Sequence, residues 1–351
     1  MIYKNALLDG KIVDIRTENG KFAEIGKISG DGVNLHGYSV YPGLVDIHSH
    51  GCIGKDTMDG KYLCEISQYL AKQGITSWLP TTMTMDMDTV KNVVNIEIPK
   101  TGGANILGFH MEGPYIAMSR KGAQNGKFIK APDLAEFKEL KNIKIVTIAP
   151  ELDGACEFIE NCGCITAIGH TDADYECSIK AMECGANCLT HTFNAMPPLN
   201  HRSPGPVGAA IEKNAYVQVI CDGLHIHKSV IKMLYRTFGA ERMALISDSM
   251  RATGMGDGIY EFGGQQITVK DSVARTADGA VAGSTSTLMD CVKKAIEFGI
   301  PKKDAFRMAS RTPSELLKVN KGQIKVGYDA DFIAVDDKLN VKLCVINGEN
   351  I

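Results

Sequence analysis

The sequence predicts an α/β protein, a (β/α)8 TIM-type barrel with a small β-sandwich domain built from both chain termini. Short strand-like runs broken by turns occupy residues 1–41 and 321–351, and eight strand-like runs alternate with helix-length segments between them. Such alternation over roughly 250 residues is typical of a parallel barrel. A few strands at either terminus would bury little surface separately, so we expect them to form one domain together.

The small domain is expected to comprise residues 1–41 and 321–351, and the barrel residues 42–320. Asp9-Gly10 and Asn19-Gly20 are hairpin signals between the N-terminal runs. The expected strands of this domain are 2–8, 11–15, 22–25, 323–326, 331–335 and 342–348.

The barrel is expected to begin with the strand Val45–Gly51. The later strands are expected at residues 76–81, 105–112, 143–149, 164–170, 187–191, 216–222 and 243–248, with helices at 61–72, 172–184, 229–238 and 285–298. Residues 256–282 contain further strand-like runs at 260–262, 266–270 and 280–282, and we expect a β excursion there. The alternative, an open doubly wound sheet, lacks a Gly-rich dinucleotide fingerprint in its first unit.

Composition limits the class of partner. The 351 residues carry a formal net charge of -3 and are 44% hydrophobic, which gives no general attraction to nucleic acid or anionic membrane. Eleven cysteines without repeated spacing, behind no secretory leader, indicate a cytoplasmic protein. No apolar run approaches the roughly 20 residues that cross a bilayer.

Six residues with metal-binding side chains end expected strands. Side chains of a strand alternate between its two faces, so His48 and His50, two residues apart on the first strand, share a face. Glu112, His170, His191 and Asp248 end the third, fifth, sixth and eighth strands. Because parallel strands of a barrel end at one rim, all six converge there. Imidazoles and carboxylates suit Zn2+ or Fe2+, and the set could hold one ion or two bridged by Glu112. Singly, His170 or His191 could equally be a structural histidine.

The phrases around these residues carry a family resemblance. They are His110–Tyr115, Gly169–Thr171, Thr190–Pro197, Asp222–His225 and Ser247–Ser249. With them the chain resembles the N-acetylglucosamine-6-phosphate deacetylase family of the amidohydrolase superfamily, from Pro42-Gly43 to the phrase Gly322–Asp331. Many superfamily members bridge two metals with a modified lysine on the fourth strand, whereas the family that this chain resembles uses a Glu on the third. Here Lys144 lies near the start of the fourth strand, away from the rim, and Glu112 is in place on the third.

The resemblance implies residue roles. Glu112, His170 and His191 would ligate the main metal site, and His48 and His50 would complete a second. Asp248 would act on a metal-activated water as general base and then as general acid. The one or two ions would be Zn2+ or Fe2+.

The resemblance also implies a phosphate site. It would consist of Arg202, His225 and backbone N–H groups at Asn194 and Ala195. Gln124 stands where some relatives place a His against the substrate; Gln can donate a hydrogen bond but cannot carry a proton.

The implied reaction converts N-acetylglucosamine 6-phosphate to glucosamine 6-phosphate and acetate. The implied assembly is a homodimer. Three alternatives to this function remain open: deacetylation of the epimer N-acetylgalactosamine 6-phosphate, another amidohydrolase activity, and a non-catalytic scaffold.

Overall fold

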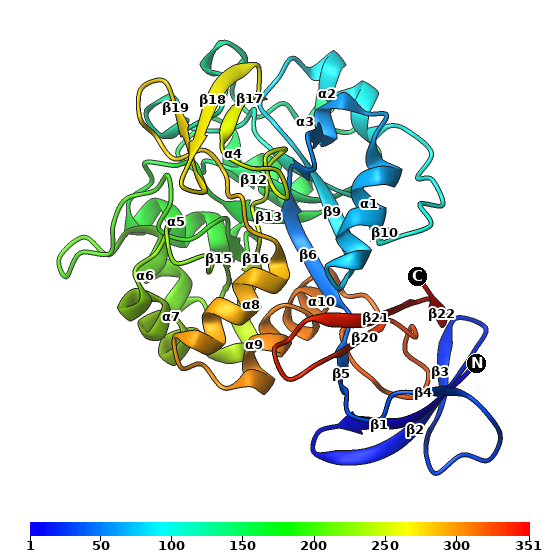
Figure 1. Ribbon diagram of the computed structural model, residues 1–351. Coiled ribbons are helices and arrows are strands. Elements are labelled where there is room, and N and C mark those ends of the chain that lie inside the picture. The colour runs from blue at the N-terminus through cyan, green and yellow to red at the C-terminus, as the bar shows by residue number, and fades with distance from the viewer.

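A computed structural model describes residues 1–351. Figure 1 shows a large barrel surrounded by helices and a smaller sheet beside its lower end, where both chain termini lie. The fold class predicted from the sequence, a TIM-type barrel with a β domain from both termini, is confirmed.

Eight parallel strands form the barrel, and each pairs with the next along the chain. They are β6 (Leu44–Ser49), β9 (Ile75–Thr82), β11 (Phe109–Glu112), β12 (Ile143–Ile148), β13 (Ile165–Ile168), β14 (Cys188–Leu189), β15 (Tyr216–Ile220) and β16 (Met243–Ile246); the short β10 (Asn105–Ile106) also pairs with β9. The last strand meets the first at the carboxyl rim of the barrel. There the Asp248 N–H donates to the His48 carbonyl at 2.9 Å, and the His50 N–H donates to the Ser249 carbonyl at 2.8 Å. The closure therefore joins three of the candidate site residues directly.

Helices cover the outside of the barrel. They are α1 (Leu63–Lys72), α2 (Met87–Val94), α3 (Leu134–Phe137), α4 (Ala155–Asn161), α5 (Tyr175–Glu183), α6 (Gly205–Glu212), α7 (Lys228–Arg242), α8 (Leu288–Glu297), α9 (Lys302–Met308) and α10 (Arg311–Leu317). Several begin at side-chain caps, as Asp174 caps α5 and Thr287 caps α8. The expected helix 229–238 extends to Arg242, with Gly239 in a non-helical conformation. No helix has the length and apolarity that a membrane crossing requires.

The small domain is one continuous sheet. Its strands are β1 (Ile2–Leu8), β2 (Lys11–Glu18), β3 (Lys21–Gly26), β4 (Val33–Asn34), β5 (Ser39–Pro42), β20 (Phe332–Val335), β21 (Val341–Ile346) and β22 (Glu349–Asn350). The Tyr3 and Phe22 rings pack on Phe332, with centroids 4.9 and 6.0 Å from it. We propose that this domain comprises residues 1–41 and 321–351, as the sequence suggests.

The prediction of a strand at residues 323–326 is wrong, because these residues form no strand. The Tyr328 N–H donates to the Lys325 carbonyl at 3.0 Å, which closes a turn instead. The contacts with β3 come from the residues that follow: the Gly327 N–H donates to the Phe22 carbonyl at 2.8 Å, and the Phe22 N–H donates to the Tyr328 carbonyl at 3.0 Å.

The predicted β excursion stands above the carboxyl rim, at the top of Figure 1. It consists of the antiparallel strands β17 (Gly258–Phe262), β18 (Gln265–Lys270) and β19 (Val273–Thr276). Its third strand is not the expected run 280–282, which forms only an isolated bridge through Val281. The remaining short elements are β7 (Gly51–Cys52), β8 (Lys55–Asp56), η1 (Thr57–Asp59), η2 (Met118–Arg120) and η3 (Gly126–Phe128).

A buried ion pair ties the start of the C-terminal segment to β20. Lys321 Nζ lies 2.5 Å from Asp331 Oδ2, and the two side chains are 7% and 1% exposed. The free Asp331 oxygen accepts the Asn347 N–H at 2.7 Å. Lys321 Nζ also lies 3.1 Å from Asp329 Oδ2, so both groups of the pair have a further polar partner.

Lys321→Met is expected to lower the free energy of unfolding by about 3–5 kcal/mol, because it leaves the Asp331 charge buried without a cation. Urea unfolding would measure this loss. The double variant Lys321→Met/Asp331→Asn should recover part of it, since the amide at position 331 retains an acceptor without the charge. A single-variant loss below about 1 kcal/mol, the value of an exposed pair, would contradict the prediction.

Candidate metal centre and active site

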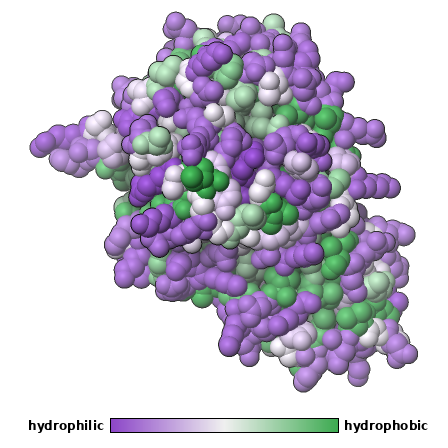
Figure 2. All heavy atoms as spheres, turned by 45° about the horizontal axis from the view of Figure 1, so that its top comes forward, coloured by the Kyte–Doolittle hydropathy of each residue, from purple (hydrophilic) through white to green (hydrophobic).

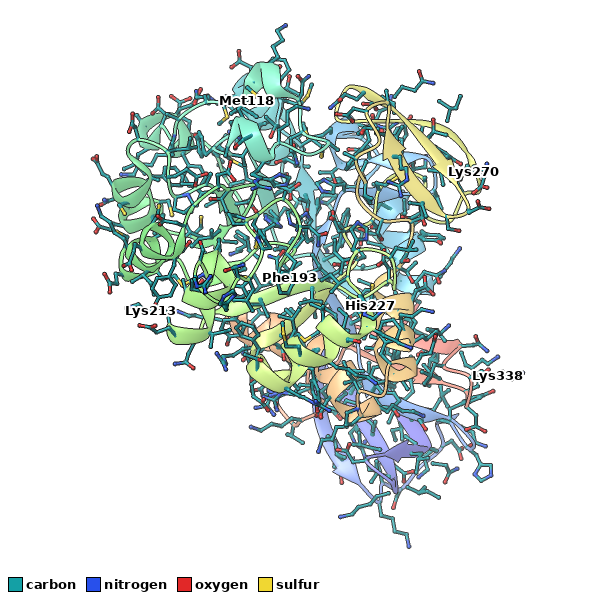
Figure 3. The ribbon with its side chains drawn as sticks, turned by 90° about the vertical axis from the view of Figure 1, so that its left-hand side faces the viewer. Met118, Phe193, Lys213, His227, Lys270 and Lys338 are labelled. Atoms are coloured by element: carbon teal, nitrogen blue, oxygen red, sulfur yellow. The ribbon has the colours of Figure 1, made fainter.

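A cavity of about 350 Å³ opens at the carboxyl rim of the barrel. Nine of the residues selected from the sequence line it: His50, Glu112, Gln124, His170, His191, Asn194, Ala195, His225 and Asp248. In Figure 3, Met118 of η2 and Lys270 of β18 mark the segments that rise on two sides of this rim. His48 is completely buried behind the cavity wall.

Glu112 lies at the centre of the histidine cluster. Its Oε1 is 3.0 Å from His191 Nε2 and 3.3 Å from the Nε2 atoms of His170 and His48. Its Oε2 is 3.3 Å from His50 Nε2. The donor atoms form two groups that share Glu112: His48 and His50 on one side, and His170 and His191 on the other.

The backbone turns three of these side chains into the rim. His170, His191 and Asp248 follow the ends of β13, β14 and β16, with φ values of 48°, 25° and 48°. Positive φ is uncommon for residues other than glycine and is maintained only where surrounding structure enforces it. Each strand therefore ends in a constrained turn that places a site residue.

The histidine tautomers fit a metal ion. His170 Nδ1 lies 2.8 Å from the Arg120 carbonyl, which can only accept, so Nδ1 carries the hydrogen. This leaves the lone pair of His170 Nε2 directed at His191 Nε2, 3.0 Å away. His48 Nδ1 similarly contacts Gln218 Oε1 at 3.1 Å. Nitrogen lone pairs and two carboxylates converging in a buried site are the donor set that Zn2+ or Fe2+ prefers.

Electrostatics also indicate that the cluster needs a cation. Burial raises the pKa of Glu112, but the surrounding imidazoles, above all His48, hold it well below its usual range. Burial lowers the pKa of His50, but Asp248 and Glu112 raise it overall to about 10. The carboxylates therefore remain ionised and draw positive charge into the cluster.

Asp248 follows β16 and contacts the two histidines of β6 and its carboxyl end across the barrel closure. Its Oδ1 lies 3.4 Å from His48 Nε2 and 3.3 Å from His50 Nε2. Burial raises its pKa, but the charge of His48 and the hydrogen bond with His50 lower it overall. An ionised carboxylate beside a metal site can accept a proton from water.

Of the four residues expected to bind a phosphate, three line the cavity and one does not. His225, Asn194 and Ala195 line the cavity, and His225 Nδ1 contacts Asp222 Oδ2 at 2.7 Å. Arg202 does not line it and lies in the exposed segment 198–203. This loop before α6 projects from the left of the barrel in Figure 1, and Figure 2 shows a hydrophilic arm there.

The sequence reasoning missed Arg120 and Phe262. Arg120 lines the cavity, holds His170 through its carbonyl and pairs with Asp172 at 2.6 Å. Phe262 of β17 packs edge-on against His50, with ring centroids 5.1 Å apart. Neither belongs to a motif. Arg120 could have been indicated only by its place after the third barrel strand, and Phe262 only by its place in the expected β excursion.

A parallel barrel with histidines and carboxylates clustered at its carboxyl rim is typical of metal-dependent hydrolases. The comparisons agree: a family model described as "Amidohydrolase family" matches residues 39–351. The chain therefore belongs to the amidohydrolase family and is a hydrolase acting on amides.

Within this family the chain is similar to sugar-phosphate deacetylases. N-acetylglucosamine-6-phosphate deacetylase of Bacillus subtilis (strain 168) is 36% identical over 97% of this chain and 90% of its own. N-acetylgalactosamine-6-phosphate deacetylase of Escherichia coli O157:H7 is 33% identical over 88% and 86%. A mutant N-acetyl-D-glucosamine-6-phosphate deacetylase from Mycobacterium smegmatis, solved with N-acetyl-D-glucosamine-6-phosphate, superposes with a TM-score of 0.93 at 30% identity, covering 100% of this chain and 98% of that one.

Asp222→Asn should destabilise the protein in a pH-dependent manner. Burial lowers the pKa of His225, but the hydrogen bond and charge of Asp222 raise it overall. Burial raises the pKa of Asp222, but His225 lowers it overall. The His225 contribution is fully present below its unfolded pKa and lost as pH rises through the folded one. The Asp222 contribution is present above its unfolded pKa and lost as pH falls through the folded one. Both are complete between about pH 4 and 6.5.

Urea unfolding should therefore show a loss of about 1.5–3 kcal/mol at pH 5.5 and a smaller loss at pH 9. The matched control is Asp14→Asn, which breaks the 2.7 Å pair with Lys4. Its loss should be similar at both pH values, because that pair contains no histidine. An Asp222→Asn loss as large at pH 9 as at pH 5.5 would show that His225 is not charged in the pair.

Proposed function

We propose that the protein hydrolyses the acetamide of N-acetylglucosamine 6-phosphate to glucosamine 6-phosphate and acetate. The observation that carries the proposal is the Asp248 carboxylate, 3.3 Å from His50 at the edge of the Glu112 cluster and inside the cavity. The names of the relatives and the sugar phosphate in the M. smegmatis structure support this substrate.

We assign the metal ligands to the two groups that share Glu112. His170 and His191 would hold one ion with it, and His48 and His50 a second, with Zn2+ or Fe2+ as the metals that suit these donors. When bound, such ions would polarise the acetamide carbonyl and lower the pKa of a water molecule.

Asp248 performs the proton transfers. Its ionised carboxylate takes a proton from the water that attacks the carbonyl carbon. It then gives that proton to the amide nitrogen as the C–N bond breaks, so that the amine leaves uncharged. The residue ends the cycle as it began, ready for the next water.

His225, Asn194 and Ala195 form the phosphate end of the cavity, with Gln124 near the reacting end. Because Arg202 lies outside its own cavity on a projecting loop, we propose a homodimer in which Arg202 reaches the site of the other subunit. Arg forks suit phosphate groups. All eleven cysteines are free, which supports a cytoplasmic location.

A second candidate substrate is N-acetylgalactosamine 6-phosphate, because the E. coli relative carries that name at 33% identity. The two sugars differ at one hydroxyl. The assay therefore includes both epimers.

Asp248→Asn should lower kcat for acetate release by about 10²–10⁴-fold, because it removes the general base. The assay compares N-acetylglucosamine 6-phosphate, its galacto epimer and unphosphorylated N-acetylglucosamine on metal-loaded protein. Wild type should prefer a phosphorylated sugar. Activity on none of the three by wild type that carries metal would refute the proposed function.

Arg202→Ala and Asp248→Ala proteins, each inactive alone, should regain activity when their subunits are mixed, because one site of each mixed dimer would hold both intact residues. Subunit exchange can be verified by mass spectrometry of differently tagged chains. Exchange without recovered activity would place both residues in one subunit's site.

A further inference from the structure

We propose that Gln124 is a positioning residue for the metal centre, whose side-chain amide fixes the carboxylate of Glu112 between the two histidine groups. The inference rests on the proposed metal-dependent function. It gives Gln124 a role different from the substrate contact that the family resemblance implies.

Both ends of the Gln124 amide are engaged, and the side chain is 2% exposed. Gln124 Oε1 accepts the Thr84 N–H at 2.7 Å, and Nε2 donates to Glu112 Oε2 at 2.7 Å. Because a backbone N–H can only donate, the oxygen must face Thr84 and the nitrogen must face Glu112. The orientation of the amide is therefore determined by its partners.

The segments that meet at this amide are tightly packed. A Cβ on Gly113, the residue after Glu112, would lie 2.0 Å from Thr84 Oγ1. The Gln124 N–H donates to the Lys121 carbonyl at 2.9 Å. The carbonyl of neighbouring Ala123 accepts a hydrogen bond from Gln265 Nε2 of β18 at 2.8 Å. Packing and backbone hydrogen bonds therefore hold the loop that carries Gln124, the donor to Glu112, in position.

The consequence for Glu112 is a fixed carboxylate plane. The terminal torsion of a Glu side chain is broad and does not set the plane by itself. With Gln124 on Oε2, that oxygen keeps its remaining lone pair for the side of His50, 3.3 Å away, while Oε1 faces His191 at 3.0 Å. An amide donates at every pH and adds no charge beside the ions.

Glu112 and Thr84 use one N–H and one oxygen lone pair of the Gln124 amide, so the positioning role leaves its second N–H to the cavity. Moving the amide away from Glu112 and Thr84 would leave buried polar groups unpaired, so these two hydrogen bonds hold it in place. The positioning role uses the arrangement as it stands.

The test compares metal binding by wild type, Gln124→Met and Gln124→His. Met removes the donor at similar volume, whereas His restores an N–H. Gln265→Met is the matched control, because it removes an amide that holds the same loop without touching Glu112. Zinc per chain would be measured after dialysis, and zinc affinity by competition with a chromophoric chelator. Melting of the chelated proteins reports folding, and kcat and KM are measured at saturating zinc.

Gln124→Met should bind zinc about 10- to 100-fold more weakly than wild type, and Gln124→His should recover most of the affinity. KM at saturating zinc should stay near the wild-type value. Unchanged zinc affinity with a raised KM would overturn the inference in favour of a substrate contact. An equal loss in Gln265→Met would overturn it in favour of general loosening of the loop. Wild type that binds zinc but releases no acetate would refute the proposed function alone, because the zinc measurement does not depend on the substrate.

Discussion

The buried negative charge of Glu112 is the constraint on which the rest of the site depends. A carboxylate that is 2% exposed must be compensated, because an isolated charge in the interior costs many kcal/mol. His48, His50, His170 and His191 surround it, yet neutral imidazoles supply no net charge. A proton can satisfy the cluster in part, as the pKa of His50, raised to about 10, indicates. Divalent ions satisfy it more completely, since they also use the nitrogen lone pairs.

The barrel makes this concentration of groups possible. Parallel strands deliver residues from distant parts of the chain to one rim, and the turns after β13, β14 and β16 direct His170, His191 and Asp248 inward. Closure between β6 and β16 uses the backbone of His48, His50 and Asp248 itself. Distortion of the closure would therefore move the proposed base and two proposed ligands together, which couples barrel integrity to the chemistry.

Site residues at the ends of barrel strands could be predicted from the sequence. Features that depend on contacts with residues distant in the sequence could not. Residues at strand ends, such as Glu112 and His191, could be placed because parallel strands share a rim. Residues 323–326 are as apolar and alternating as a strand, but a turn at Lys325–Tyr328 interrupts them. The direction of the Gln124 amide depends on Thr84, forty residues away along the chain, because its hydrogen-bond partners and not its spacing define it. Arg202 could be placed on its loop from the sequence but not relative to the cavity.

Charge balance explains why the phosphate end differs from the reacting end. The cavity contains the acids Glu112 and Asp248, and the guanidinium of Arg120 already pairs with Asp172. His225 lines the proposed phosphate end, but its Nδ1 already contacts Asp222 Oδ2 at 2.7 Å, so a phosphate would enter with little compensation from this chain alone. In the proposed mechanism, the metal ligands and Asp248 all belong to one barrel. In the proposed homodimer, Arg202 on the projecting loop of one chain would supply a second cation to the phosphate in the site of the other. In this arrangement the catalytic centre would exist in each subunit, and substrate affinity would depend on assembly.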